Sequence, residues 1–244
     1  MLLDVQGLYS GYQNVAVLKD INFSLRTGEI TGLIGLNGAG KSTLLKTILG
    51  LISPQQGRIE LDQTTIYEDH QAYARQIAYI PETPILYEAL TLQEHIEMTG
   101  LGYGIPSEVL WERAQPLLKT FRLDKHLSWF PSHFSKGMKQ KVMVICALIT
   151  DAKLLIIDEP FLGLDPLAIR DFTQLLKNRV QEGISILLTT HVLSIAPTLC
   201  DNYLLLQDGQ LKGQGNLEDL QKAYKMPDAS LDDIYIRMTE EVAQ

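Results

Sequence analysis

The chain has 244 residues, of which 45% are hydrophobic and 20% charged, proportions typical of a globular protein with a sizeable core. Its formal net charge of -8 and pI of about 5.1 argue against a broad basic face for nucleic acid phosphates, although a local basic patch is still allowed. The longest uninterrupted apolar run, VMVICALI at residues 142–149, is far shorter than the ~18 residues that span a bilayer. If the protein works at a membrane, we expect another chain to supply the span.

The cysteines and the N-terminal stretch point to a reducing compartment. Cys146 and Cys200 are too far apart in sequence for a metal knuckle and too few for a disulfide scaffold, so we interpret them as small core residues. The stretch MLLDVQGLYS has no basic region and reaches Asp4 at once, so no secretory signal is expected. These features predict a globular protein of the cytosol.

Strand-like stretches come first along the chain, then helical ones. Strands are predicted over residues 2–9, 16–25, 28–35 and 57–63, from the stretches LLDVQGLY, AVLKDINFSL, GEITGLIG and GRIELDQ. From about residue 86 to 150 the apolar residues recur at helical spacing, as in LTLQEHIEM and VLWERAQPLLKTF. The short apolar runs LLII and ISILLTT are separated by the helix-like DPLAIRDFTQLLKNRV, a pattern typical of buried parallel strands joined by a crossover helix.

The strongest local motif is GLNGAGKST at residues 35–43, which matches G-x-x-x-x-G-K-[ST] and lies between an apolar strand and the helix-like KSTLLKTILG. Glycines let such a loop wrap a phosphate, and the helix N-terminus adds partial positive charge. Lys41 would reach the β and γ phosphates of a nucleotide, and the Ser42 hydroxyl would bind Mg²⁺. The other predicted nucleotide-binding residues of this motif are Gly35, Asn37, Gly38, Gly40 and Thr43.

Polar residues also follow two later apolar runs. In LLIIDEP, Asp158 is placed to hold Mg²⁺, and Glu159 to orient or deprotonate an attacking water. In LLTTHV, His191 could hydrogen-bond the γ-phosphate or that water, although a lone histidine is as often structural. The sequence thus predicts a phosphate-hydrolysing site at the ends of buried strands.

These motifs, together with HFSKGMKQK at residues 133–141, resemble the nucleotide-binding subunit of ATP-binding cassette (ABC) transporters over nearly the whole chain. The resemblance implies an α/β P-loop NTPase domain of the ABC type with an antiparallel β subdomain and a helical subdomain. It implies one domain over 1–244, with the helical subdomain at about 86–150 and a C-terminal helical tail at about 217–244. In that tail Leu231, Ile234, Tyr235 and Met238 recur at helical spacing, and we expect them to dock on their own domain rather than on a second copy.

The family signature LSGGQ corresponds here to FSKGM, residues 134–138. In the family this stretch begins a helix that points at the nucleotide bound by the other subunit of a head-to-tail dimer. Ser135 is retained as helix N-cap and γ-phosphate donor, and Gly137 is retained where the backbone approaches the phosphate. Lys136 and Met138 replace a glycine and a glutamine. Because an added cation is compatible with ATP, we predict a working variant.

Other landmarks of the family follow in order. Tyr12 matches the aromatic residue that stacks on adenine. Gly163, Leu164 and Asp165 match the D-loop, which crosses the dimer interface. Glu82 stands where the family usually has the glutamine of the Q-loop. A glutamate can still bind Mg²⁺ but adds a charge beside the triphosphate.

The resemblance implies ATP and Mg²⁺ as ligands, a second copy of the chain and a separate polytopic membrane subunit as partners, and no nucleic acid. Through the membrane subunit this cytoplasmic chain would lie at the cytoplasmic face of the cell membrane. The stretches IPETPILYEALTL, HFSKGMKQKVM and IIDEPFLGLDPLAI are similar to one bacterial subgroup in particular. Leu86, Tyr87 and Leu90 are candidates for contact with the membrane subunit, and ordinary core packing is the alternative. For the chain as a whole, a soluble ABC-type ATPase clamp is the alternative function, and a P-loop kinase would have no need of FSKGM.

Overall fold

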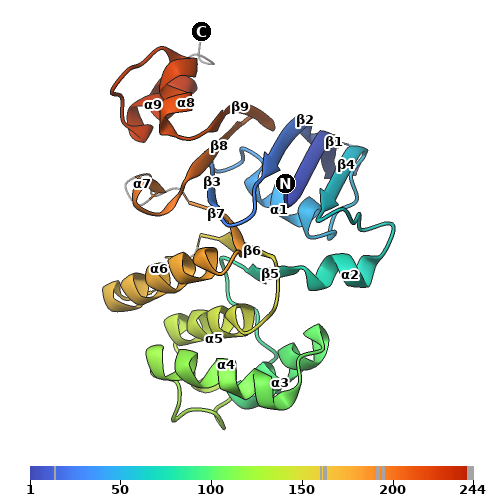
Figure 1. Ribbon diagram of the computed structural model, residues 1–244, viewed down its shortest axis with the longest axis vertical. Coiled ribbons are helices and arrows are strands. Elements are labelled where there is room, and N and C mark those ends of the chain that lie inside the picture. The colour runs from blue at the N-terminus through green and yellow to red at the C-terminus, as the bar shows by residue number, and fades with distance from the viewer. Residues whose placement is uncertain (14, 160, 162–163, 191–192, 194–195, 241–244) are drawn as a thin grey trace.

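The computed structural model describes residues 1–13, 15–159, 161, 164–190, 193 and 196–240 (Figure 1). Within them the strands are β1 Leu3–Tyr12, β2 Val15–Leu25, β3 Ile30–Ile34, β4 Gln56–Leu61, β5 Ile77–Ile80, β6 Leu154–Asp158, β7 Ser185–Thr189, β8 Asn202–Gln207 and β9 Gln210–Gly215. The helices are α1 Lys41–Ile48, α2 His70–Arg75, α3 Leu92–Tyr103, α4 Ser107–Thr120, α5 Lys136–Leu148, α6 Pro166–Gln181, α7 Ala196–Leu199, α8 Leu217–Tyr224 and α9 Leu231–Glu240, with a 3-10 turn η1 at Pro131–His133.

The described strands form two sheets. The smaller is antiparallel, with the order β2-β1-β4, and Leu3 of its central strand is paired with Leu25 and Leu61. The larger has the order β5-β6-β7-β3-β8-β9 and is parallel from β5 to β8, while β9 pairs antiparallel with β8. Every residue of β3, β6 and β7 is buried, as expected for strands covered on both faces. The parallel strands and crossover helix predicted around LLII and ISILLTT are confirmed.

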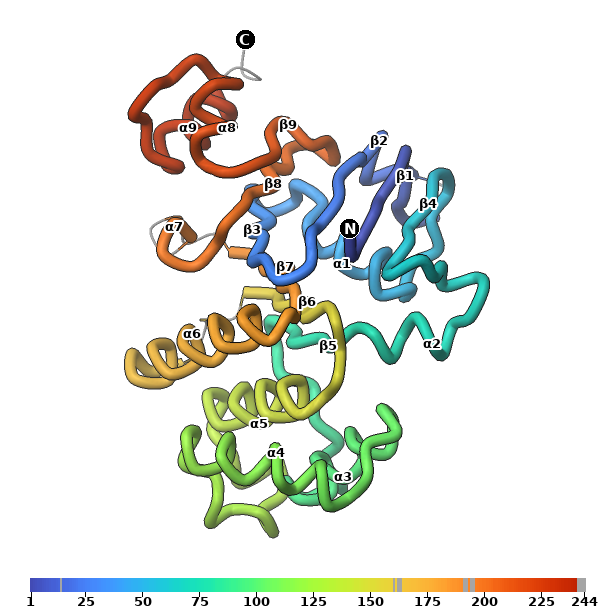
Figure 2. Tube along the Cα trace, viewed as in Figure 1, coloured from blue at the N-terminus to red at the C-terminus, as the bar shows by residue number. Residues whose placement is uncertain are grey.

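Several elements of the larger sheet were not predicted from the sequence. β5 is only four residues long, and its IAYI pattern is continuous rather than alternating, so periodicity cannot distinguish it from a piece of helix. β8 and β9 form a hairpin whose first strand is buried and whose second strand alternates between exposed and half-buried residues. They extend the sheet beyond β3 and carry the chain to α8 and α9 (Figure 2).

The helices α3, α4 and α5, called here the helical group, lie at the end of the molecule opposite α8 and α9 (Figure 2). A capping box begins α3: the Thr91 hydroxyl accepts from the Glu94 N–H at 3.3 Å, and the Glu94 carboxylate accepts from the Thr91 N–H at 2.7 Å. On α5, Val142 and Ile145 are fully buried in the core shared with α3 and α4, in agreement with the helical spacing of apolar residues predicted over about 86–150. No helix within the described residues is long and apolar enough to cross a bilayer.

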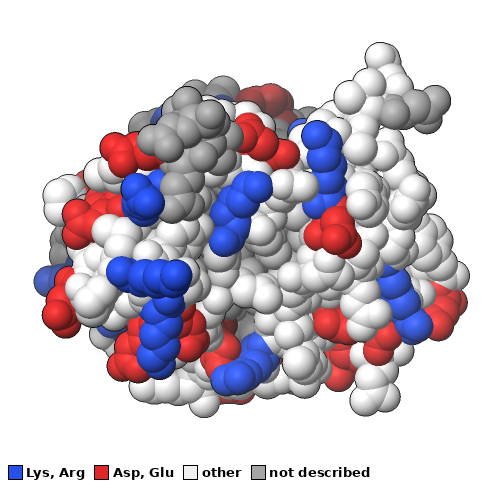
Figure 3. Space-filling view, turned by 90° about the horizontal axis from the view of Figure 1, so that it is seen from above, with Lys and Arg blue, Asp and Glu red and all other residues white. Residues whose placement is uncertain are grey.

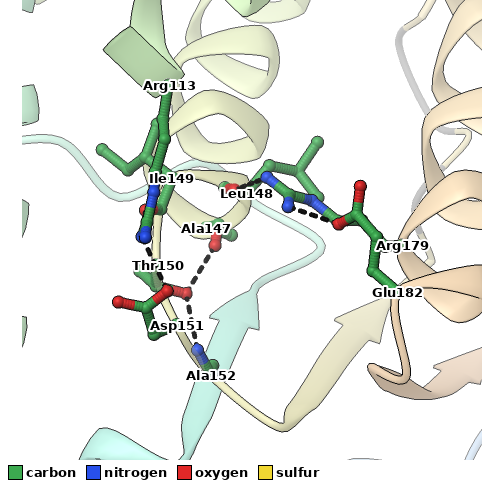
Figure 4. A network of polar contacts seen from close by, with 9 residues as sticks. All are labelled: Arg113, Ala147, Leu148, Ile149, Thr150, Asp151, Ala152, Arg179 and Glu182. Atoms are coloured by element: carbon green, nitrogen blue, oxygen red, sulfur yellow. Dashed lines mark hydrogen bonds and ion pairs between the residues drawn. The ribbon is translucent and has the colours of Figure 1, made fainter. Parts of the chain in front are cut away.

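Two arginines from different helices hold the C-terminal end of α5 (Figure 4). Arg113 of α4 donates to the Ile149 carbonyl at 3.1 Å, and Arg179 of α6 donates to the Leu148 carbonyl. The last carbonyls of a helix lack intrahelical partners and carry partial negative charge, so guanidinium groups suit this position. Each guanidinium also pairs at 2.7 Å with one carboxylate, that of Asp151 or Glu182. This end of α5 is therefore fixed to both α4 and α6.

Substitution of Arg179 tests this attachment. Arg179→Met removes the donor to the Leu148 carbonyl and is expected to lower the free energy of unfolding by about 1–3 kcal/mol. Urea denaturation followed by circular dichroism measures the change. Arg170→Met is the matched control, because Arg170 lies on the same helix, is largely exposed and pairs only with its neighbour Asp171 among the described residues. Equal losses in the two variants would contradict the assigned role of Arg179.

Candidate functional site

A cavity of about 290 Å³ lies where β3, β5 and β6 end. In open α/β sheets, ligands bind beyond the carboxyl ends of the strands, so its position is that of a ligand site. Its lining residues are Ile34, Gly35, Leu36, Asn37, Lys41, Ser42, Glu82, Asp158, Glu159, Leu193 and Tyr235. A larger hollow of about 530 Å³ elsewhere contains none of the predicted site residues, so the chemistry points to the smaller one.

The loop between β3 and α1 encloses the ammonium group of Lys41. Gly38 and Gly40 have φ values of 85° and 110°, in the left-handed region where a side chain is strained. A Cβ atom on Gly40 would also approach a methyl group of Leu18 to 2.9 Å. Lys41 is only 8% exposed, and its Nζ donates to the carbonyl of Gly35 at 2.7 Å. The loop therefore holds the ammonium of Lys41, a residue that lines the cavity, against the Gly35 carbonyl.

Negatively charged side chains outnumber positively charged ones among the described residues that line the cavity. Burial lowers the pKa of Lys41 below its ordinary value of 10.5, while the charges of Glu159, Asp158 and Glu82 act in the opposite direction. Among the described lining residues, Lys41 thus faces three carboxylates. An anionic ligand would be repelled by that excess unless a cation accompanied it. The site therefore fits a polyphosphate bound together with a metal ion better than a free anion.

Oxygen donors suited to Mg²⁺ are present in the cavity, namely the Ser42 hydroxyl and the carboxylates of Glu82 and Asp158. No group of three or more His, Cys, Asp or Glu within the described residues has the arrangement of a metal cluster. Mg²⁺ does not require one, because it is usually held by one or two carboxylates together with substrate phosphates and water. The donor set is therefore compatible with Mg²⁺.

Thr189, at the end of β7, organises the acid that ends β6, Asp158, and the acid that follows it, Glu159. Its hydroxyl donates to Asp158 Oδ1 at 2.5 Å and accepts from the Glu159 backbone N–H at 2.9 Å. Both carboxylate residues are largely buried, and Glu159 has a φ of 48°, a conformation that costs about 1–3 kcal/mol in a residue other than glycine. Sequence reasoning missed Thr189, although its place in LLTTHV, at the end of an apolar run, was a usable signal.

Some predicted nucleotide-binding residues do not line the cavity. Gly38 and Gly40 belong to the loop between β3 and α1, and Thr43 is a buried residue of α1. Tyr12 ends β1 with 47% of its surface exposed, so its ring is open to a ligand. His191 lies outside the described residues, as does Gly163.

The FSKGM stretch lies at the start of α5, well away from α1 in Figure 1. Ser135 caps α5 as predicted, since its Oγ accepts from the Met138 N–H at 3.2 Å, and Gly137 lies in the first turn. None of the residues that line the cavity belongs to α5. Ser135 is exposed, so its hydroxyl remains accessible to a second molecule.

Asp165 is the N-cap of α6, where its Oδ1 accepts from the Ala168 N–H at 2.9 Å. Its Oδ2 accepts from Lys141 of α5 at 3.2 Å. These contacts lower the pKa of Asp165, with the backbone hydrogen bond from Ala168 as the largest cause. The residue matched to the D-loop thus also joins α5 to α6.

The face seen in Figure 3 carries Lys and Arg interspersed with Asp and Glu over its described part, rather than one continuous basic field.

Comparison with known proteins identifies the family. A protein-family model with the description "ABC transporter" matches residues 18–162 of the chain. The chain is 50% identical over 242 residues to the ABC-type transporter ATP-binding protein EcsA of Bacillus subtilis (strain 168), covering 99% of this chain and 98% of that protein. A solved ATP-binding subunit of an ABC transporter superposes with a TM-score of 0.96 at 46% identity, covering 98% and 100% of the two chains.

A second solved structure, cbiO1 from Clostridium perfringens, is part of the ABC transporter complex cbiONQ. It superposes with a TM-score of 0.75 at 28% identity, covering 98% of each chain. The fold class and family resemblance predicted from the sequence are confirmed, including the similarity to one bacterial subgroup, which is that of EcsA. The chain belongs to the ABC transporter family as an ATP-binding subunit, and its activity class is that of an ABC ATPase.

Proposed function

We propose that the chain binds ATP with Mg²⁺ in the 290 Å³ cavity and hydrolyses it to drive a conformational change in a separate membrane subunit. The observation that carries this proposal is the Lys41 ammonium, enclosed by a phosphate-binding loop and facing three carboxylates at the strand ends. In this function Lys41 binds the β and γ phosphates, and Ser42, Glu82 and Asp158 bind the metal. Nucleotide contacts from the same chain come from Tyr12, Gly35, Asn37, Gly38, Gly40 and Thr43.

Glu159 is the proposed general base. Its carboxylate lines the same cavity as Lys41, so it can accept a proton from a water aligned with the terminal phosphate. Thr189 holds the Glu159 backbone and the Asp158 carboxylate in one arrangement, which keeps the two acids in separate roles. Bound Mg²⁺ supplies positive charge to the phosphate oxygens. His191 is proposed as a further contact to the γ-phosphate or the water.

A second copy of the chain would complete the site. ATP-binding subunits of ABC transporters work as dimers with membrane components. In this chain Ser135 is exposed, caps a helix N-terminus that suits a phosphate, and lies outside the cavity. We infer a head-to-tail dimer in which Ser135, Gly137 and Asp165 of each copy approach the nucleotide held by the other. Two ATP molecules would then be buried at the interface.

The proposed membrane partner is a polytopic subunit of the EcsB type, because the chain is 50% identical to EcsA over nearly its full length. The segment that follows Glu82 offers a contact surface. Ile85 is 73% exposed and Tyr87 is 63% exposed, whereas Leu86 is half-buried and packs against the core. Exposed apolar side chains beside a site commonly mark a docking surface. The chain would then lie at the cytoplasmic face of the cell membrane through its partner.

The solution mass of Glu159→Gln, with and without Mg-ATP, tests the shared site. Removal of the base leaves bound ATP intact, so the variant is expected to change from monomer to dimer only when ATP is present. Light scattering after gel filtration measures this mass. The double variant Lys41→Ala, Glu159→Gln is the control and should stay monomeric. A monomer that binds ATP yet never dimerises would contradict a site completed by a second copy alone.

Substitution of Glu82 tests its proposed part in metal binding. Glu82→Ala removes a carboxylate ligand and is expected to raise the Mg²⁺ concentration needed for half-maximal ATP hydrolysis by about tenfold or more. Glu82→Gln keeps one carbonyl oxygen and removes the charge, so it should retain hydrolysis. ATPase rates over a Mg²⁺ series give the result. Unchanged hydrolysis and unchanged coupling to the membrane subunit in Glu82→Ala would exclude this role.

A further inference from the structure

The C-terminal helix α9 is firmly attached to the body of the protein. Ser230 precedes the first turn of α9. The Ser230 Oγ accepts from the Asp233 N–H at 3.2 Å, and the Ser230 N–H donates to Asp233 Oδ2 at 2.9 Å. Leu231, Ile234 and Met238 are buried in the main hydrophobic core. Three buried side chains spread over two turns fix the rotation of a helix about its own axis. The direction of each remaining side chain of α9 is therefore also determined.

Tyr235 follows Ile234 directly and lines the same cavity as Lys41, Ser42 and Glu159. Its ring is half-buried and packs against the core together with Leu193, so the side chain is supported on one side. Within the described residues, its hydroxyl has no hydrogen-bond partner. A phenol hydroxyl can donate one hydrogen bond and usually has a partner when it is partly buried.

The chemistry of the cavity indicates what that partner is. Glu82, Asp158 and Glu159 can only accept hydrogen bonds when ionised, so donors to a phosphate must come from other groups. Lys41 and Ser42 supply two of them, and both lie in the first turn of α1, directly after the phosphate-binding loop. Burial raises the pKa of Tyr235, which keeps its hydroxyl protonated and uncharged near neutral pH. A neutral donor adds no further negative charge beside these carboxylates.

We infer that the Tyr235 hydroxyl donates a hydrogen bond to the terminal phosphate of bound ATP, so that α9 is part of the nucleotide site. The inference rests on the proposed function. The contact is assigned to the terminal phosphate because Tyr235 lines the same cavity as Lys41 and the three carboxylate residues. Tyr12, the candidate for contact with adenine, does not line that cavity. ADP lacks that phosphate, and the contact therefore favours ATP over ADP.

Equilibrium binding of ATP and ADP to the full-length chain tests the contact. Both affinities are measured with Mg²⁺ by displacement of a fluorescent nucleotide, in a Glu159→Gln background that prevents hydrolysis and at a protein concentration below that of dimerisation. Tyr235→Phe retains the ring and removes only the hydroxyl, and should weaken ATP binding about tenfold while ADP binding is unchanged. Ile236→Ala is the control, because Ile236 is the next residue on α9 and is 53% exposed. It should change neither affinity.

The possible results separate this inference from the proposed function. ATP binding by Tyr235→Phe equal to that of the parent would overturn the hydroxyl contact. Equal weakening of ATP and ADP would also overturn it, since the residue would then only shape the cavity. Lys41→Ala is measured alongside. If Lys41→Ala abolishes ATP binding and Tyr235→Phe has no effect, only the inference fails. If the Glu159→Gln parent binds no ATP, or Lys41→Ala binds ATP normally, the proposed site is wrong. The inference depends on that site and is then wrong as well.

Discussion

The burial of the Lys41 ammonium is the interaction on which the rest of the structure depends. Removing an ammonium from water costs several kcal/mol unless other groups replace its hydration. Here the Gly35 and Leu36 carbonyls accept from Nζ at 2.7 and 3.2 Å, and three carboxylates lie close enough to oppose the lowering of the Lys41 pKa. This arrangement requires β3, β5 and β6 to end at one edge, which a parallel sheet provides.

Local motifs explain why much of the site could be predicted from the sequence. The phosphate-binding loop and the Asp158–Glu159 pair are contiguous stretches whose glycines and acids follow apolar runs, so their chemistry and position are visible together. Tyr235 was predicted only as a docking residue of the tail. Its place in the cavity depends on how β8, β9 and α8 carry the chain back toward the phosphate-binding loop, and no short-range pattern specifies that path. Thr189 was missed because its role depends on the pairing of β7 with β6.

The signature helix α5 begins with lysines, although cations are unfavourable at a helix N-terminus. Two of them have partners in neighbouring segments: Lys139 pairs with Glu88 at 3.4 Å, and Lys141 pairs with Asp165 at 3.2 Å. Asp165 also caps α6, where a negative charge is favourable. These ion pairs offset the unfavourable placement of lysines near the helix N-terminus. They also connect the first turns of α5 to the segment after Glu82 and to α6.

Gln140 connects the same end of α5 to the cavity more directly. It is almost fully buried, and its Nε2 donates to the carbonyl of Pro81, the residue before Glu82, at 3.4 Å. Its Oε1 has no partner among the described residues, so the contact to Pro81 is the only hydrogen bond of this side chain in the described part of the chain. A shift of Glu82 toward a bound metal would have to carry α5 with it or leave the Gln140 amide unpaired, at about 1–3 kcal/mol. Because the other end of α5 is fixed by arginines from α4 and α6, such a shift would change the orientation of Ser135 rather than detach the helix.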